Sequence, residues 1–349
     1  MANKAREIIS PDDPEILVRV VILHVGQGNS AVVLFADGDS YKSMLIDVNL
    51  DQRAEGIDVP RLMSDLLGDG SLDIFVNTHP HNDHLCGILE LDEAVQISEV
   101  WHSGHVPGPE DRDAYDNLQK VIKHVKENGG DEVELDGSKT PYAIGEAQCY
   151  ILAPAEHVKE EIAGEKPEVR RQRIHEHCAV LRVGLGDTWI MLPGDADLQA
   201  WRDHISEYHK DRLPSCVFAA PHHSSRSFFM DKEGDEPYLD ALQGINPEYV
   251  IVSAPRQDES RHGHPHDDAM ELYEDQVGQE NVLHTGKDRH CYICDIFRNG
   301  EYGVEADGGE LVAAYKYDPD GGDGGKEAKK GPNILARPRA DVREPRPFA

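Results

Sequence analysis

Three histidines and one aspartate lie within six consecutive residues of the sequence, 79–84 (HPHNDH). The preceding run, residues 72–76, is short and apolar, which is typical of a buried strand. Pro80 cannot continue the hydrogen-bond ladder of a strand, so we expect a loop at the carboxyl end of that strand. A loop can aim closely spaced side chains at one point, whereas a helix would spread them around its circumference. The sequence therefore predicts a metal site formed by His79, His81, Asp83 and His84.

The strands that must hold this loop are predicted from similar patterns. Residues 16–23, 31–35 and 43–46 are β-rich runs separated by glycine-containing turns, and they predict a meander. Two later apolar runs, 188–192 and 216–220, each lead through a proline into polar residues. These polar residues are Asp195 in the first case and His222 and His223 in the second.

The H-x-H-x-D-H motif resembles that of the metallo-β-lactamase superfamily. The resemblance implies that His79 and His81 bind a first metal ion and that Asp83 and His84 bind a second. Residues 192–195 (LPGD) match the L-L-x-G-D motif of that family. Its aspartate, here Asp195, is expected to bridge both ions, because a carboxylate offers two oxygens.

Further motifs resemble the hydrolase domain of ComEC-type DNA-uptake proteins. Residues 25–30 (VGQGNS) and 45–47 (LID) match its glycine turn and the strand that follows, and residues 221–224 (PHHS) and 263–265 (GHP) match two later motifs. The sequence departs from these relatives at His24 and Asn29, where they carry aspartate, and at Ser224, where they carry glycine.

The resemblance implies roles for four more residues. Asp47 is expected to support the histidine loop from behind, as carboxylates beside metal-bound histidines do. One histidine of the pair 222 and 223 is expected to bind the second ion. We favour His222, at the strand end, and leave His223 as a supporting or substrate contact. His264 is expected in the cleft, placed to donate to a phosphate oxygen or a leaving group.

Residues 156–178 leave two questions open. His177 precedes a predicted strand, at a place where relatives carry asparagine-rich sequence. It either completes the first metal site, contacts substrate or is a structural polar residue. Arg170, Arg171 and Arg173 form a dense basic patch in the charged insertion 156–174. They either grip a phosphate backbone or belong to a solvated surface turn.

These motifs together imply a hydrolase that depends on two divalent cations. The ions are Zn²⁺ or Mn²⁺, because histidine and carboxylate ligands without cysteine suit either. A metal-bridging hydroxide would attack the substrate, and Asp83 would also orient that nucleophile. The expected activity is that of a ComEC-type phosphodiesterase or nuclease. Two alternatives stay open: a hydrolase of a small phosphodiester or other ester, and a partner-dependent effector or metal-stabilised interaction module.

The composition limits the partners. The 349 residues carry a formal net charge of −31, which disfavours non-specific binding to nucleic acid or anionic membranes, although bound cations can invert the field near a site. No apolar run approaches the roughly 20 residues of a membrane-spanning helix. We therefore expect a soluble cytoplasmic protein that does not bind a membrane. Its substrate would be nucleic acid or a small phosphodiester, and a protein partner is left open.

The fold class follows from the family resemblance. It implies an α/β fold, a four-layer αββα sandwich of two mixed sheets with outer helices. Residues 1–317 are expected to form one hydrolase domain, with 1–15 as a loose leader. Residues 318–349 are rich in glycine, proline and charge, which predicts a disordered tail because such a segment cannot bury a core.

Overall fold

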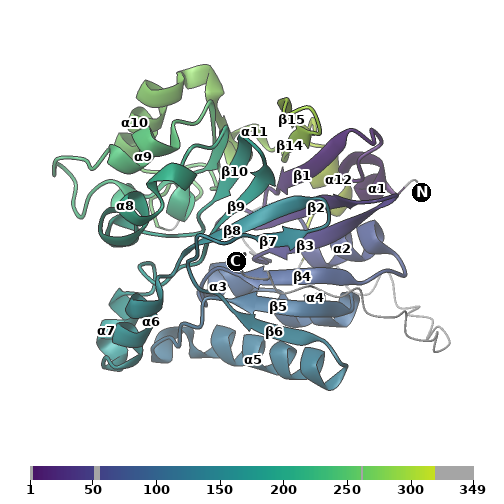
Figure 1. Cartoon of the computed structure of the whole chain (residues 1–349), viewed down its shortest axis with the longest axis horizontal. Coiled ribbons are helices and arrows are strands. Elements are labelled where there is room, and N and C mark those ends of the chain that lie inside the picture. Colours follow the sequence, from purple (N-terminus) through teal and green to yellow (C-terminus); the bar gives the residue numbers. More distant parts are fainter. Residues whose placement is uncertain (1–2, 51–55, 261, 319–349) are drawn as a thin grey trace, which may run out of the picture.

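The computed structural model describes residues 3–50, 56–260 and 262–318. Within these residues the chain forms two sheets that pack face to face, with helices on both outer surfaces (Figure 1). The first sheet has eight strands in the order β15-β14-β1-β2-β3-β4-β5-β6, and the second has seven in the order β13-β12-β11-β10-β9-β8-β7. Both sheets mix parallel and antiparallel pairs, so the expected αββα sandwich is confirmed.

The first sheet begins with the expected antiparallel meander and continues in parallel from β3 to β6. Its strands are β1 Ile16–Ile22, β2 Ala31–Asp37, β3 Ser40–Ile46, β4 Leu72–Asn77, β5 Ile97–His102, β6 Asp131–Glu134, β14 Tyr292–Phe297 and β15 Tyr302–Ala306. Because β3 and β4 are parallel, their carboxyl ends meet at one edge of the sheet. Asp47 and the loop that carries His79 therefore emerge side by side.

The second sheet also gathers strand ends at one edge. Its strands are β7 Tyr142–Ile144, β8 Ala147–Ala153, β9 Val180–Leu185, β10 Thr188–Leu192, β11 Val217–Ala219, β12 Tyr249–Val252 and β13 Val282–His284. The four strands from β10 to β13 are mutually parallel. Asp195, the histidine pair at 222 and 223, and Ser253 follow three of these strands, so all of them lie near the same edge.

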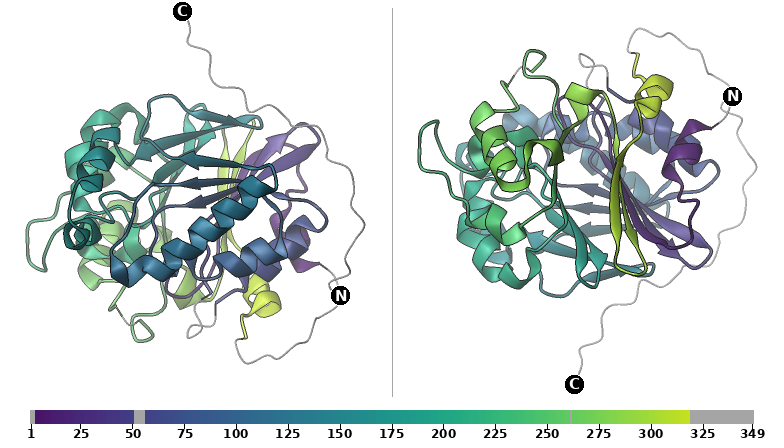
Figure 2. Two further views of the ribbon diagram at one scale, coloured as in Figure 1. Left: turned by 90° about the horizontal axis from the view of Figure 1, so that it is seen from below. Right: turned by 90° about the horizontal axis from the view of Figure 1, so that it is seen from above.

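Apolar side chains fill three layers of the sandwich. The middle layer lies between the sheets and includes Val33, Phe35, Leu181 and Ile190. The first outer layer lies under α1 Lys4–Ile9, α2 Val59–Leu67, α4 Ile88–Ala94, α5 Arg112–Glu127 and α12 Glu310–Tyr315, and the second lies under α9 Asp240–Ile245 and α10 Asp267–Val277 (Figure 2).

Short helical segments make the remaining connections. They are α3 Asn82–Leu85, α6 Glu156–Ala163, α7 Pro167–Gln172, α8 Ser206–Tyr208, α11 Thr285–Asp288, a π-helical turn Ala200–Ile205, and 3₁₀ turns at Pro109–Asp111, Lys210–Arg212, Pro221–Ser224, Arg226–Phe228 and Gln279–Asn281. None of the helices in the described part of the chain is long and apolar enough to cross a membrane.

The amino-terminal segment differs from the loose leader that we expected over residues 1–15. Lys4–Ile9 forms a helix, with the side chain of Asn3 accepting the N–H of Arg6 as its cap. Ala5 and Ile9, one turn apart, are completely buried in the outer layer that α2 also covers. Helical spacing of these apolar residues, rather than the two prolines that follow, decides the structure. The predicted disordered tail lies outside the described residues, except for Asp318.

Candidate metal centre

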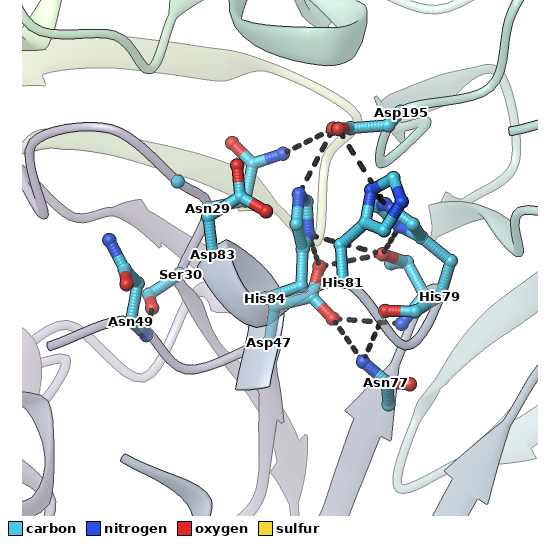
Figure 3. A network of polar contacts seen from close by, with 12 residues as sticks. Asn29, Ser30, Asp47, Asn49, Asn77, His79, His81, Asp83, His84 and Asp195 are labelled. Carbon is cyan, nitrogen blue, oxygen red and sulfur yellow. Dashed lines mark hydrogen bonds and ion pairs between the residues drawn. The ribbon is translucent and has the colours of Figure 1, made fainter. Parts of the chain in front are cut away.

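Asp47 organises the base of the centre from the end of β3. Its Oδ1 accepts the N–H of Thr78 at 2.8 Å, and its Oδ2 accepts the Thr78 hydroxyl at 2.7 Å. The same Oδ2 lies 2.6 Å from Nδ1 of His84 (Figure 3). Asp47 thus holds both ends of the histidine loop, and it directs the Nε2 of His84 away from itself toward Asp195.

A first group of potential ligands consists of His79, His81, His175 and Asp195, whose ligand atoms all lie within 4.8 Å of one another. Nδ1 of His81 lies 3.0 Å from Nε2 of His79 and 3.2 Å from Nε2 of His175. Oδ2 of Asp195 lies 3.7 Å from Nε2 of His79. Three imidazoles and a carboxylate around one point form a donor set suited to Zn²⁺ or Mn²⁺.

A second group consists of Asp83, His84 and His223. Nε2 of His223 lies 3.4 Å from Oδ2 of Asp83. Asp195 approaches this group as well, with Oδ1 at 3.2 Å from Nε2 of His84 and Oδ2 at 3.7 Å from Nε2 of His223. Asp195 therefore lies between the two groups, in reach of both.

The donor atoms of the second group fit a cation. His84 donates its Nδ1–H to Asp47, and His223 donates its Nδ1–H to the carbonyl of Ser253 at 3.0 Å. In the neutral tautomers this leaves a lone pair on each Nε2, and both lone pairs face carboxylate oxygens. Both Nε2 atoms are buried, with no hydrogen-bond partner among the described residues. A nitrogen lone pair and a carboxylate oxygen repel each other. A proton on each ring or a metal ion between the groups relieves this repulsion.

The pKa values separate the two groups of histidines. Burial, reinforced by neighbouring imidazoles, holds the pKa values of His79 and His175 well below the usual range, so both rings are neutral at pH 7. Burial acts the same way on His84, but Asp195 and Asp47 outweigh it and raise its pKa well above the usual value. Burial would raise the pKa of Asp195, yet His84 and His223 hold it well below its usual range.

The structure brings His223 rather than His222 to the second group, contrary to our preference from the sequence. Residues 222, 223 and 224 all have left-handed backbone conformations, with φ of 48°, 55° and 60°. This turn directs His223 inward. His222 lies at the rim, with Nε2 at 3.8 Å from Oδ2 of Asp195 and Nδ1 at 2.9 Å from the hydroxyl of Ser227.

The structure also places His175, not His177, with the first group. The N–H of His177 donates to the carbonyl of Arg173, as in a helical turn, where residues two apart point in different directions. His177 instead pairs with His105, their Nδ1 atoms being 2.9 Å apart. Nothing in the local sequence distinguishes the two histidines of residues 175–177 (HEH), so sequence reasoning missed His175.

The basic patch lies on and beside α7. Arg173 donates to both carboxylate oxygens of Glu176, at 2.6 and 2.8 Å, and to Glu161 at 3.0 Å. Its guanidinium is therefore held by two acids. Arg170 is half-buried on α7, and Arg171 is exposed on the same helix.

His264 lies beside the centre, as expected from the sequence. Its ring centroid is 5.1 Å from that of His222 and 6.2 Å from that of His223. Burial lowers the pKa of His264 to about 3 and that of His222 to about 4, so both rings are neutral at pH 7. Nδ1 of His264 is buried and has no hydrogen-bond partner within the described residues.

Residues 25–30 reach the centre from the first sheet. A Cβ at Gly28 would overlap the backbone oxygen of Asp83, so only glycine allows this turn to press against the histidine loop. The turn brings the amide of Asn29 within 3.5 Å of Oδ1 of Asp195 (Figure 3). Asn29 and Thr78 both contact candidate ligands. Nothing in the sequence indicated that Thr78 has a functional role.

One comparison with known proteins agrees with the motifs. Residues 25–202, just over half of the chain, match the family model described as the metallo-beta-lactamase superfamily. A search of curated proteins found no match. A diphosphatase structure from the PhnP family is 13% identical over 76% of this chain and 94% of its own, with a TM-score of 0.40. An archaeal metallo-beta-lactamase superfamily protein from Sulfolobus tokodaii is 15% identical over 50% of this chain and 62% of its own, with a TM-score of 0.28.

Proposed function

This chain belongs to the metallo-β-lactamase superfamily, and from that premise we propose that it is a phosphodiesterase that uses two divalent metal ions. The proposal treats residues 1–317 as one hydrolase unit, because the two sheets supply the ligands jointly. Asp83 and His84 follow a strand of the first sheet, whereas Asp195 and His223 follow strands of the second.

One observation carries the proposal. Asp195 lies between two groups of ligand atoms, 3.2 Å from Nε2 of His84 with one oxygen and 3.7 Å from Nε2 of His79 with the other. His79, His81 and His175 would hold one ion, Asp83, His84 and His223 the other, and Asp195 both. Ions held there would act as Lewis acids on a phosphoryl oxygen and would lower the pKa of a coordinated water.

The residues around the ligands can bind and orient a substrate. His222 and His264 are neutral, and each can donate one N–H to a phosphate oxygen or to the leaving oxygen. Burial would raise the pKa of Asp83, but His223 and His84 hold it below the usual range. Asp83 therefore stays ionised, and its carboxylate can orient a water molecule by accepting a hydrogen bond.

Two observations favour a small phosphodiester over nucleic acid as the substrate. Arg173 is committed to Glu176 and Glu161, so its charge is already neutralised where a phosphate backbone would need it. The net charge of −31 also repels a polyanion at low salt. A ComEC-type nuclease remains the second candidate, because the turn at residues 25–30, one of the motifs of that resemblance, contacts Asp83 and Asp195.

The test is a hydrolysis screen with metal analysis. Protein freed of metal by a chelator and then supplied with Zn²⁺ or Mn²⁺ should bind about two ions per chain and hydrolyse bis-p-nitrophenyl phosphate. Parallel digests of plasmid and single-stranded DNA distinguish the two candidates. Turnover of the small diester without DNA cleavage supports the first candidate, and cleavage of both supports the nuclease. Protein that binds metal but hydrolyses neither would contradict the proposal.

A further inference from the structure

One buried sulfur contacts two of the segments that carry candidate ligands. Cys178 lies at the start of the segment that leads into β9, and it has no exposed surface. Its Sγ accepts the backbone N–H of Asp195 at 3.2 Å. The same sulfur lies 3.6 Å from Nδ1 of His79, on the side of that ring opposite the ligand nitrogen. Cys178 is thus in contact with one residue of the histidine loop and one of the loop after β10.

The thiol can both accept and donate at this position. It accepts from the N–H of Asp195, and it can accept from Nδ1–H of His79, the protonated nitrogen when Nε2 is free to bind metal. Its own proton can point to the carbonyl of Pro193 at 3.7 Å or to that of Ala179 at 3.6 Å. A weak donor and acceptor of this kind orients neighbours without binding the metal itself. The ligand groups described above do not include Cys178.

The size of the sulfur also sets the position of the loop that carries Asp195. Gly194 has a φ of 55°, and a Cβ there would lie 2.7 Å from the sulfur of Cys178 and 2.9 Å from Cβ of Thr78. The backbone at Gly194 therefore rests directly on Cys178 and Thr78. A smaller side chain at position 178 would leave a gap beneath Gly194, and a branched one would push the loop outward.

We propose that Cys178 is a positioning residue, which fixes Asp195 relative to His79 and so sets the geometry of the whole centre. The inference rests on the proposed metal centre, and it deepens that proposal. Cys178 acts through Asp195 and His79, and it does not touch substrate. Its contribution is therefore expected in the affinity for metal and in kcat, with little change in KM.

The experiment measures metal affinity without any substrate. Zn²⁺ affinity is determined by competition with a chromophoric chelator for the wild type, Cys178→Ala and Cys178→Ser, and the thermal unfolding of each metal-free protein is recorded. Loss of a contact that orients a ligand typically lowers metal affinity by roughly 10- to 100-fold, which is the loss expected for Cys178→Ala. Cys178→Ser keeps a donor and an acceptor but is smaller, so its affinity should lie between that of Cys178→Ala and that of the wild type.

A matched control comes from Cys149. It is also completely buried, but it lies in the layer between the sheets and donates to the carbonyl of Tyr150. Cys149→Ala should lower the unfolding temperature and leave Zn²⁺ affinity unchanged. If Cys178 only fills space, Cys178→Ala and Cys178→Ser will lose affinity equally, or neither will lose it, and the inference is overturned. A wild type that binds no divalent metal would instead overturn the metal centre itself.

Discussion

The carboxyl ends of β10 and β13 lie at the same edge of the second sheet, yet the buried polar residues there have different surroundings. After β10, Asp195 faces the Nε2 atoms of His84 and His223, which have no hydrogen-bond partner among the described residues. At the end of β13, Nδ1 of His284 accepts the N–H groups of Gly286 and Lys287, both at 3.2 Å. His284 thereby caps the short helix α11.

The difference shows that burial of a histidine does not by itself indicate a metal site. His284 is 5% exposed, and its lone pair is used by the backbone. His84 and His223 are as buried, but their lone pairs face carboxylates, an arrangement that a cation would stabilise. The decisive observation is thus the atom that each ring nitrogen faces.

Among the variants that test this comparison, Asp195→Ala should have the largest effect on metal affinity. It removes the carboxylate that both ligand groups share, so Zn²⁺ affinity should fall by more than about 100-fold, the upper range for residues that only support a ligand. Diesterase activity should be lost with it. Chelator competition and the bis-p-nitrophenyl phosphate assay measure these losses. His284→Ala is the control at the end of β13. A comparable loss of metal in that variant would contradict the difference between the ends of β10 and β13.

His223→Ala and His222→Ala form the next test, because the two residues are adjacent but differ in what they face. His223→Ala should reduce the bound metal from about two ions per chain to about one, since it removes a ligand of the second group. His222→Ala should keep the stoichiometry and raise KM. Elemental analysis of the purified proteins after metal loading gives the ratio. The opposite outcome would restore the assignment favoured by the sequence.

Asp47→Ala should have a smaller effect. Asp47 touches no candidate ion, but it holds Nδ1 of His84 at 2.6 Å and accepts two hydrogen bonds from Thr78. Its removal should lower metal affinity by roughly 10- to 100-fold, because His84 loses its orientation. Titration with a chelator gives the value. Asp73→Ala offers a control, since that carboxylate at β4 binds Ser43 and Lys42 instead. Equal losses of metal affinity in both variants would mean that Asp47→Ala acts by perturbing the first sheet as a whole, not by releasing His84.

A different kind of effect is expected at His284, in the stability of the metal-free protein rather than in metal binding. Burial lowers its pKa to about 4, against an ordinary value of 6.5. The unfolded chain therefore binds one more proton than the folded chain between these two values, and stability is lost as the pH falls from 6.5 toward 4. At roughly 1.4 kcal/mol per pH unit below 6.5, the loss between pH 7.5 and pH 5 is about 2 kcal/mol. Urea unfolding of chelator-treated protein at pH 7.5 and pH 5 measures it.

His284→Asn is the informative variant for that test. The amide oxygen of asparagine can accept from the backbone of α11 but does not titrate in this range. The variant should therefore lose less stability than the wild type between pH 7.5 and pH 5. If His284→Asn loses as much stability as the wild type between pH 7.5 and pH 5, the fold does not depend on an unprotonated Nδ1 at His284.

The sequence alone was sufficient for the local parts of the centre. An apolar strand followed by proline and closely spaced histidines predicted that residues 79–84 carry ligands together, but we expected a loop, and Asp83 and His84 lie on the short helix α3. The match to the family's L-L-x-G-D motif identified Asp195. The supporting role of Asp47 was implied by the family resemblance and agrees with its contacts to Thr78 and His84. These features were predictable because residues at the ends of parallel strands emerge at one edge, whatever the rest of the chain does.

Only the tertiary structure decided which histidines face the centre. His175 and His223 belong to the ligand groups, whereas His177 pairs with His105 and His222 lies at the rim of the centre. In sequence, His177 is two residues from His175, and His222 is adjacent to His223. The choice depends on left-handed backbone at 222–224 and on the hydrogen bond from Ala179 N–H to the carbonyl of Thr78, which docks one sheet against the other. Contacts between residues about a hundred positions apart leave no periodic pattern in the sequence, so only the folded chain could reveal them.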